Sequence, residues 1–220
     1  MTLSDSVSTG LQALAQLPAL QNYPCQHHAE DFERYLQLLQ QWNRTFNLTA
    51  IRDAEDQVIR HLLDSLVLLP YLEADRIADV GTGAGLPGIP LAIADPRRQW
   101  SLIDSNSKKT RFVTQVKLDL NLHQVTVIHD RVETLSTGPF DQIICRAFKP
   151  LDQLVDSLSH LLSADGVILA MIGKPPDREA EAKLSQQGTI ALIPLTVPGL
   201  NATRFLLTIK PKSRATGVRA

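Results

Sequence analysis

The sequence has very few of the residues that hold small secreted proteins together. Its 220 residues include only two cysteines, Cys25 and Cys145, which lie far apart and form no C-x-x-C pair. The sequence therefore indicates neither a disulfide framework nor a cysteine zinc site, and we expect no metal partner. This use of cysteine fits a reducing compartment.

Signals for export or for a membrane are also missing. The first ten residues, MTLSDSVSTG, contain one acid and no Lys or Arg, and they do not resemble a signal peptide. No run in the chain approaches the roughly 20 apolar residues that a membrane-spanning helix requires. We therefore expect a cytoplasmic protein with no membrane partner.

The balance of charge differs between the two parts of the chain, although the net charge is only −1. Residues 1–75 hold 10 acidic and 4 basic residues, whereas residues 76–220 hold 13 acidic and 18 basic residues. From Arg204 to the end of the chain there are five bases and no acid. Such a tail is either a solvated end or a contact for a polyanion such as RNA, and charge alone leaves both readings open.

The hydrophobic pattern changes near residue 75. Before it, apolar side chains recur at helical spacing in 31–43 and 57–72. After it, short apolar runs alternate with helical ones. We expect strands at 76–80, 100–104, 125–129, 141–146 and 166–172, helices from Gly88 and at 107–120 and 151–162, and further apolar runs at 189–197 and 204–209.

This alternation predicts an α/β fold, with a Rossmann-like parallel sheet, helices on both faces and an N-terminal helical segment. With 44% hydrophobic residues, the chain can bury roughly 70% of its unfolded surface, which fits one main domain. We expect a helical segment at 1–75 that packs on the core, a ligand-binding domain at 76–211 and a basic tail at 212–220. Ligands of such sheets bind beyond the carboxyl ends of the strands.

The stretch IADVGTGAGLPG, residues 77–88, follows the first expected strand. It contains G-x-G-x-x-G at Gly83, Gly85 and Gly88, the spacing of a dinucleotide-binding loop. In that loop, however, the first glycine closely follows the strand. Counted from the strand, the first glycine is Gly81, and the third position is Leu86.

Aligned to the strand, the pattern is D-x-G-x-G-x-G, formed by Asp79, Gly81, Gly83 and Gly85. It resembles motif I of the S-adenosylmethionine-dependent methyltransferases. That cofactor has no pyrophosphate, so the following helix need not aim free N–H groups at an anion, and Pro87 removes one such donor. Glycines let the backbone approach the cofactor closely, and Asp79 can hold the methionine ammonium directly or through water.

Asp104 ends the second expected strand, 23 residues after Gly81. An acid at this place can accept both ribose hydroxyls of a nucleoside cofactor, or it can cap the next helix. Asp104 does not distinguish NAD from S-adenosylmethionine.

Six segments together resemble the bacterial glucose-inhibited division protein B family, the small-subunit ribosomal RNA methyltransferase G. They are QWNRTFNLTAIRD, RHLLDSL, DVGTGAGLPGIPLAI, LIDSNSKKTRF, DRVE and CRAF, in the order and spacing of the family. The likeness runs from about Gln41 to Gly173 and resumes weakly at TRFLLTIKP. It implies a class I methyltransferase sheet and transfer of a methyl group from S-adenosylmethionine to N7 of a guanine in 16S rRNA of the small ribosomal subunit.

Matching positions imply which residues bind the cofactor. They are Gly81, Leu86, Val132, Glu133 and Arg146, with Asp104 on the ribose. Val132 and Glu133 follow the third strand, where methyltransferases commonly read the adenine. A buried Arg146 needs a partner, and a cofactor carboxylate or an RNA phosphate would supply one.

The residues after the fourth strand, CRAFKP, lack the Asn or Asp followed by Pro-Pro with which many methyltransferases hold an exocyclic amine. Guanine N7 already has a free lone pair, so its attack needs alignment and no deprotonation. We therefore expect Arg146 to position the reactants and no general base to act. Cys145 is interpreted as strand packing, and Phe148 either stacks on a flipped base or belongs to the core.

Several other residues are candidates for contact with RNA. His61, Asp64 and Ser65 lie at i, i+3 and i+4 and resemble family positions near the crevice, although Arg60 and Asp64 can also simply pair. Trp42, Asn43 and Asn47 have either functional or structural roles. The remaining candidates are Arg204 and Lys174, where the family tends to have Lys-Gly and this chain has Ile172-Gly173-Lys174, which leaves the role of Lys174 open.

Two other functions compete with that of an rRNA methyltransferase. A nicotinamide-dependent oxidoreductase is disfavoured by the register of the glycines and by the lack of a separate substrate domain. A non-catalytic module for ribosome assembly would not need the intact glycine loop, Asp104 and Glu133. We expect a monomer.

Overall fold

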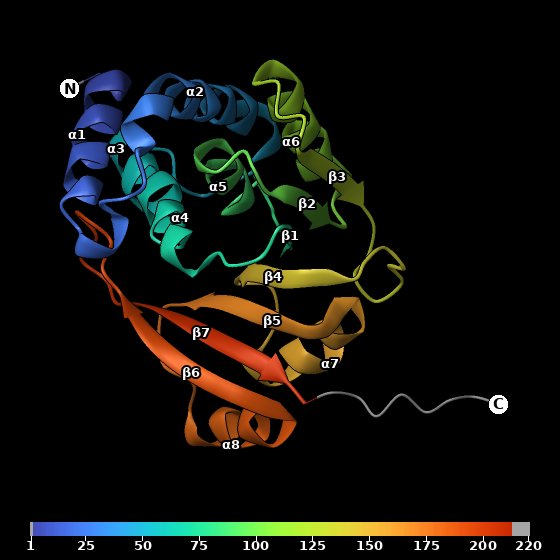
Figure 1. Cartoon of the computed structure of the whole chain (residues 1–220). Coiled ribbons are helices and arrows are strands. Elements are labelled where there is room, and N and C mark those ends of the chain that lie inside the picture. The colour runs from blue at the N-terminus through green and yellow to red at the C-terminus, as the bar shows by residue number, and fades with distance from the viewer. Residues whose placement is uncertain (1, 213–220) are drawn as a thin grey trace.

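The computed structural model describes residues 2–212, and at its centre lies a seven-stranded sheet with the order β3-β2-β1-β4-β5-β7-β6 (Figure 1). Neighbouring strands among β1 to β5 are parallel, whereas β7 runs antiparallel to both β5 and β6. The strands are β1 Arg76–Val80, β2 Gln99–Asp104, β3 Val125–His129, β4 Phe140–Arg146, β5 Leu162–Ile172, β6 Gly188–Leu195 and β7 Arg204–Pro211.

The sequence predicted a parallel sheet, which is wrong for β7. Only residues 196–203 connect β6 to β7. A parallel return needs a crossover of roughly a dozen residues or more, so this short connection makes β7 antiparallel to β6. The longer connection from β5 to β6 contains α8, and β6 lies beyond β7 at the edge of the sheet.

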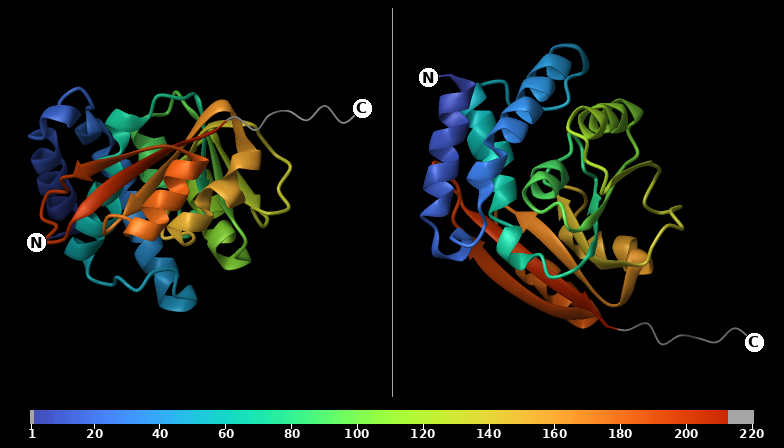
Figure 2. Two further views of the ribbon diagram at one scale, coloured as in Figure 1. Left: turned by 90° about the horizontal axis from the view of Figure 1, so that it is seen from below. Right: turned by 45° about the horizontal axis from the view of Figure 1, so that its top comes forward.

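Helices cover both faces of the sheet, as expected (Figure 2). The N-terminal helices, α5 and α6 share one hydrophobic core with Ile77, Leu102 and Ile144 of the strands. Helices α7 and α8 pack on the other face. Ile143 points to that face and its neighbour Ile144 to the first one, because successive side chains of a strand alternate between the two faces. The helices are α1 Leu3–Ala15, α2 Ala29–Phe46, α3 Ala54–Gln57, α4 Asp64–Leu66, α5 Gly88–Ala94, α6 Ser107–Asp119, α7 Leu154–Leu158 and α8 Arg178–Gln187.

Most of the predicted elements agree with the structure to within three residues, and two of the predicted helices do not. The helix predicted at 151–162 consists of two 3₁₀ turns flanking α7 and ends at Leu161, so β5 begins four residues earlier than expected. Helix α8 was not predicted, because Leu184 is its one buried residue and its hydrophobic periodicity is weak.

The helix predicted at 57–72 is the second helix that differs from its prediction. A π-helical stretch, η3 Val58–Leu63, separates α3 from α4, and a 3₁₀ turn follows at Leu69–Tyr71. A π-bulge shifts the register of the side chains and frequently occurs at functional sites. This stretch carries Arg60 and His61.

The link between the N-terminal helices and the sheet is fastened by Gln142 of β4, which is 6% exposed. Its Oε1 accepts from the N–H groups of Glu73 (3.0 Å) and Ala74 (3.1 Å), and its Nε2 donates to the Tyr71 carbonyl (2.9 Å). One side chain thus satisfies three backbone groups of the connecting segment.

Two further expectations concern a membrane span and the C-terminal tail. In the part of the chain that the structure describes, no helix has the length and apolar character needed to cross a membrane. The basic tail expected at 212–220 lies outside the described residues, apart from Lys212, whose N–H donates to the Gln187 carbonyl (2.8 Å).

We predict that Gln142→Ala lowers the free energy of unfolding by roughly 2–4 kcal/mol, because three backbone groups lose their partner. Gln37→Ala, an equal truncation on the exposed surface of α2, should change it by less than about 0.5 kcal/mol. Denaturant unfolding of both variants measures the difference. Equal losses would show that Gln142 does not anchor this segment.

Candidate functional site

The loop between β1 and α5 has a backbone that only glycine adopts readily. Gly81, Gly83 and Gly85 have φ angles of 72°, 60° and 82°. A Cβ at Gly81 would lie 2.6 Å from Cδ2 of Phe148, whereas at Gly83 the nearest atoms would be 3.9 Å away. The loop is therefore closely packed at Gly81 and open at Gly83.

Asp79 stabilises this loop through hydrogen bonds with Thr82 and Gly88. Its side chain is buried, and Oδ2 accepts from the Thr82 hydroxyl (2.6 Å) and from the Gly88 N–H (2.8 Å). Oδ1 is buried with no hydrogen-bond partner among the described residues, and burial raises the pKa of Asp79 to about 6. The structure thus places Asp79 under the loop and does not bring it to the wall of a cavity, where we expected it to meet a ligand.

A cavity of about 320 Å³, which we call the loop cavity, opens beyond the carboxyl ends of β1, β2 and β3. Four of the residues expected to bind the cofactor line it: Gly81, Asp104, Val132 and Glu133. Leu86 is buried beside the loop, where its N–H donates to the Thr82 carbonyl (2.8 Å), and it does not reach the cavity. Gly83, Gly85 and Arg146 do not line it either.

Asp104 links the glycine loop to the second strand. Its Oδ2 accepts from the Gly83 N–H (2.9 Å), and its Oδ1 accepts from the Asn106 N–H (2.8 Å). Asn106 caps α6, so the alternative that Asp104 is the helix cap is wrong. Each carboxylate oxygen can accept a further hydrogen bond, which leaves Asp104 able to bind hydroxyl groups.

Glu133 lies at the rim of the loop cavity and is paired with Lys149 at 2.6 Å. The hydrogen bond from Lys149 lowers the pKa of Glu133, which therefore stays ionised at neutral pH. Lys149 also donates to the Ser157 hydroxyl (3.1 Å) and lies 5.5 Å from the centre of the Phe148 ring. Lys149 was not among the residues predicted for the site. Its position directly after CRAF is the one feature of the sequence that could have indicated it.

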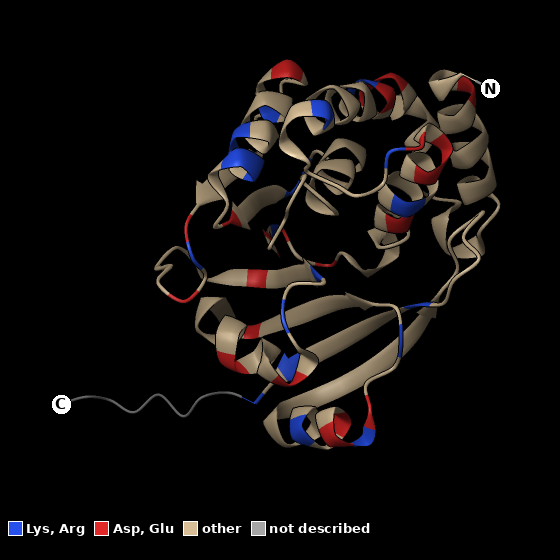
Figure 3. Cartoon of the chain, turned by 180° about the vertical axis from the view of Figure 1, so that it is seen from behind, with Lys and Arg blue, Asp and Glu red and all other residues tan. Residues whose placement is uncertain are grey.

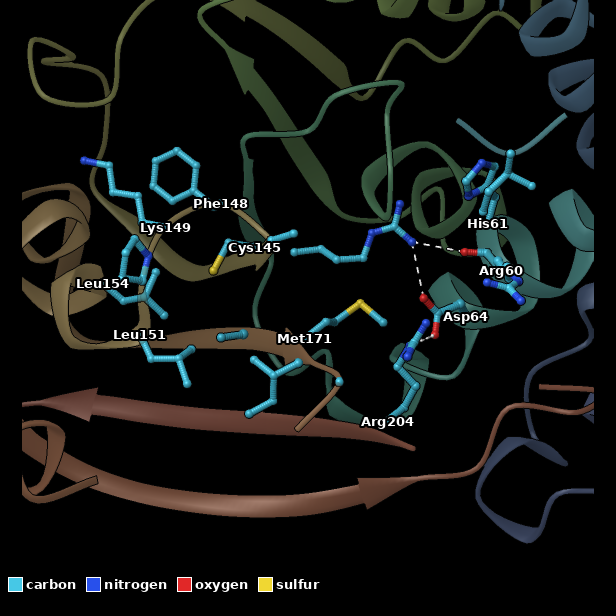
Figure 4. Close-up of a pocket in the computed structure, with 17 residues that line it drawn as sticks. Arg60, His61, Asp64, Cys145, Phe148, Lys149, Leu151, Leu154, Met171 and Arg204 are labelled. Atoms are coloured by element: carbon cyan, nitrogen blue, oxygen red, sulfur yellow. Dashed lines mark hydrogen bonds and ion pairs between the residues drawn. The ribbon is translucent and has the colours of Figure 1, made fainter. Parts of the chain in front are cut away.

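A second cavity of about 550 Å³, which we call the arginine cavity, adjoins the first and shares Ala147, Phe148 and Lys149 with it. Figure 4 shows Arg60, His61 and Asp64 on one side of it and Phe148 and Lys149 on the other. Phe148, which lies over Gly81, therefore stands at the boundary of the two cavities.

Asp64 is the centre of an ion triad in the arginine cavity, and its side chain is 1% exposed. Its Oδ2 accepts from Nη1 of Arg146 (3.2 Å), and its Oδ1 accepts from Nε of Arg204 (2.9 Å). The alternative that Arg60 and Asp64 simply pair with each other is wrong. Arg60 points outward to Asp56 (3.1 Å), and its carbonyl instead accepts from Arg146 (3.2 Å).

The arginine cavity has an excess of positive charge, because Arg146 and Arg204 share the single carboxylate of Asp64. Four of its lining residues are basic, but Arg60 is paired with Asp56 and Lys149 with Glu133. The four are Arg60, Arg146, Lys149 and Arg204. An electropositive cavity with two arginines held side by side is suited to a phosphate or another anion.

His61 is buried, and its Nε2 lies 3.0 Å from the Thr49 hydroxyl. Burial, followed by the charge of Arg146, lowers its pKa to about 4, so His61 is neutral at physiological pH. The Thr49 N–H donates to Oδ1 of Asn43 (2.9 Å), and Asn47 ends α2 in the left-handed region with a φ of 49°. Asn43 thus supports the residue that contacts His61, whereas Asn47 ends the helix and accepts a hydrogen bond from Arg52 (2.9 Å).

Three other residues considered in the sequence lie in different surroundings. Ser65 is buried, and its hydroxyl donates to the His61 carbonyl (2.5 Å), so it faces the helix and not the cavity. Lys174 is exposed one residue beyond Gly173, which lines the arginine cavity. Cys145 lines this cavity, but burial raises its pKa to about 12, which agrees with packing and not with a nucleophile.

The N-terminal segment also supports the glycine loop directly. Tyr35 of α2 is fully buried, and its hydroxyl donates to the Ala84 carbonyl (2.8 Å). In the sequence, Tyr35 was one of the periodic apolar residues of a helix, so nothing local indicated its contact with the loop. Lys109, which lines the loop cavity, was missed as well.

Within residues 2–212, no group of three or more His, Cys, Asp or Glu side chains is arranged to hold a metal ion. The groups that line the two cavities are instead suited to hydroxyls, to a base and to anions.

Comparisons with known proteins show which family the chain resembles. The family model described as rRNA small subunit methyltransferase G matches residues 28–207. A ribosomal RNA small subunit methyltransferase G from Marinomonas sp. is 42% identical over 96% of this chain and 100% of its own length. Proteins of the same name from Hydrogenovibrio crunogenus and Pseudomonas syringae are 48% and 44% identical, over 80% and 94% of this chain and 82% and 94% of their own.

Solved structures show a likeness in fold. A SAM-dependent methyltransferase from Aquifex aeolicus superposes with a TM-score of 0.53 at 15% identity, over 70% of this chain and 92% of its own. A predicted O-methyltransferase from Agrobacterium tumefaciens gives 0.52 at 21% identity, over 70% and 80%. The sheet therefore has the architecture of class I methyltransferases.

We predict that Asp64→Asn lowers the free energy of unfolding by about 3 kcal/mol, because two partly buried arginines lose their shared negative charge. Asp56→Asn, which breaks an exposed pair on the same helical segment, should cost less than about 1 kcal/mol. Denaturant unfolding compares the two. A small, equal effect would mean that the triad does not hold these elements together.

Proposed function

The chain belongs to the family of the small-subunit ribosomal RNA methyltransferase G, and we therefore propose that it transfers a methyl group from S-adenosylmethionine to N7 of a guanine in 16S rRNA. The observation that carries the proposal is the pair of adjoining cavities with Phe148 at their boundary. One cavity has the groups that suit a nucleoside cofactor, and the other has those that suit an RNA nucleotide.

The residues of the loop cavity fit S-adenosylmethionine. Asp104 would hold the ribose with its remaining lone pairs, and Val132 and Glu133 would contact the adenine. Because Gly81 and Gly83 have no side chain, the backbone of the loop would approach the rest of the cofactor closely. Gly85 and the buried Leu86 would maintain the conformation of the loop. When bound, the cofactor supplies an electrophilic methyl group on a sulfonium.

The arginine cavity suits the target nucleotide. Asp64 holds Arg146 and Arg204 at fixed positions, and the net positive charge favours a phosphate of the RNA. Phe148, at the boundary, is placed to lie against a guanine. We assign Arg146 a positioning role, because its guanidinium faces this cavity and is already held by Asp64 and the Arg60 carbonyl.

The two groups of the arginine cavity whose pKa values are strongly shifted, His61 and Cys145, do not titrate near neutrality. His61 has a pKa of about 4, and Cys145 has a pKa of about 12. Attack by guanine N7 requires no general base, because its lone pair carries no proton. Alignment of the base with the methyl group is then the main contribution of the protein.

We propose 16S rRNA in the small ribosomal subunit as the partner and a monomer as the active form. No observation favours a nicotinamide-dependent oxidoreductase, since Leu86 stands where that loop needs its third glycine. A non-catalytic assembly module remains as an outcome of the experiment below.

The decisive experiment incubates the protein and labelled S-adenosylmethionine with small subunits that lack the modification. We expect label in 16S rRNA at one guanine, which then becomes sensitive to chain cleavage after borohydride reduction, a property of N7-methylated guanine. Asp104→Ala should abolish transfer and weaken cofactor binding in calorimetry. Cofactor binding without transfer would indicate an assembly module, and binding of NADH in its place would indicate an oxidoreductase.

We further predict that the single-turnover rate at saturating substrates is nearly independent of pH from about 7 to 9. Over this range His61 stays neutral and Cys145 stays protonated, so no group needed for the step changes its charge. Arg146→Ala should lower the rate without adding a pH-dependent step, and Arg146→Lys should restore part of it. A clear titration in the wild-type rate, or a product methylated on an exocyclic amine, would overturn the N7 assignment.

A further inference from the structure

A surface groove of about 520 Å³ lies between α6, the edge strand β3 and Trp42 of α2. It shares no lining residue with the loop cavity or the arginine cavity. We call it the α6–β3 groove. Arg111, Thr114, Gln115 and Leu118 of α6 line it together with Trp42 and His129.

The groove carries uncompensated positive charge. None of its nine lining residues is Asp or Glu, and Arg111 is exposed with no ion pair or hydrogen bond of its side chain among the described residues. Lys108, one turn earlier on α6, is also exposed, and its side chain likewise has no ion pair or hydrogen bond among the described residues. Figure 3 shows basic positions recurring along α6.

The acid on α6 does not neutralise this charge. Asp119 is held at the far end of the helix by Arg34 of α2, in two hydrogen bonds of 2.7 and 2.8 Å. A neighbouring molecule that binds the groove therefore meets positive charge that no carboxylate of the lining residues balances.

Apolar surface accompanies the charge. Leu118 is 64% exposed, the highest value among the large hydrophobic side chains of the described residues. Trp42 also lines the groove and packs against Phe46, which is itself 38% exposed, with their ring centres 5.3 Å apart. Thr114 and Gln115 add neutral hydrogen-bonding groups between these surfaces.

This combination suits a single strand of nucleic acid. Arginine and hydroxyl groups bind phosphates, while exposed apolar and aromatic side chains accept the faces of unpaired bases. The groove also begins beside the proposed cofactor site, because α6 starts three residues after Asp104 and Lys109 in its first turn lines the loop cavity.

We propose that the α6–β3 groove binds a single-stranded segment of rRNA outside the two cavities, as a second contact that anchors the substrate. The identity of the RNA rests on the proposed function. The groove would add affinity and leave the methyl-transfer step to the cavities, because none of its residues reaches either cavity.

The test measures binding of deproteinised 16S rRNA to the full chain at several salt concentrations. Arg111→Ala should weaken binding several-fold and lower the log–log salt slope by about 0.7–0.9, the value for one lost phosphate contact. Leu118→Glu should weaken binding further, because it places a negative charge where a base would lie. The rate at saturating RNA and the affinity for S-adenosylmethionine should be unchanged in both variants.

Arg76→Ala is the control, since it removes one exposed arginine at the amino-terminal end of β1, where among the described residues its only partner is Asp141. It should leave both the affinity and the slope as in the wild type. Unfolding curves establish that all three variants are folded.

Two results would overturn the proposal. Unchanged affinity and slope in both groove variants would show that RNA does not bind there. Weaker binding to assembled subunits alone, with deproteinised rRNA unaffected, would show that the groove contacts a ribosomal protein. These failures are separate from failure of the proposed function, in which the wild-type protein itself would transfer no methyl group to rRNA.

Discussion

The carboxylate of Asp64 joins three parts of the chain at the candidate site. It is almost fully buried on α4 and accepts hydrogen bonds from Arg146 at the end of β4 and Arg204 at the start of β7. A buried charge of this kind is tolerated only where it is paired, so the three elements must meet in this arrangement. The position of Arg146, the shape of the arginine cavity and its positive charge all depend on this contact.

The N-terminal helices are part of the site and not a cover over it. Tyr35 of α2 supports the glycine loop at Ala84, and the chain from Asn43 through Thr49 holds His61 at the arginine cavity. The π-helical stretch between α3 and α4 carries His61 toward this cavity while Arg60 points its side chain to the outside. Both cavities therefore depend on a segment that lies outside the Rossmann-like sheet.

The side chains of the two cavities are suited to orienting reactants and not to transferring protons. The loop cavity has hydroxyl acceptors in Asp104 and an acid held ionised in Glu133, and the arginine cavity has cations held in position by a single carboxylate. Its two groups with strongly shifted pKa values, His61 and Cys145, are shifted away from neutrality. A reaction that needs alignment of two reactants and no proton transfer fits such a site, and methylation of a ring nitrogen with a free lone pair is one.

The sequence by itself determined the alternation of strands and helices, the register of the glycine loop and the membership in the family. Each of these depends on residues that are close in sequence, such as the two-residue shift from Gly83 to Gly81 that places Leu86 and not a glycine at the third position of the dinucleotide pattern. It also placed Gly81, Asp104, Val132 and Glu133 correctly at one cavity, because the carboxyl ends of parallel strands meet at one edge of the sheet.

Only the tertiary structure decided the partners of the charged residues and the division of the site into two cavities. Local spacing left a pair with Arg60 open as one alternative for Asp64, but its partners lie 82 and 140 residues away in sequence. Tyr35 meets Ala84 across 49 residues, and the α6–β3 groove brings Trp42 beside a later helix and an edge strand. Periodicity shows which face of an element is buried, but the atoms that a buried polar group meets are set by how the elements pack, because its hydrogen bonds need contacts within about 3 Å.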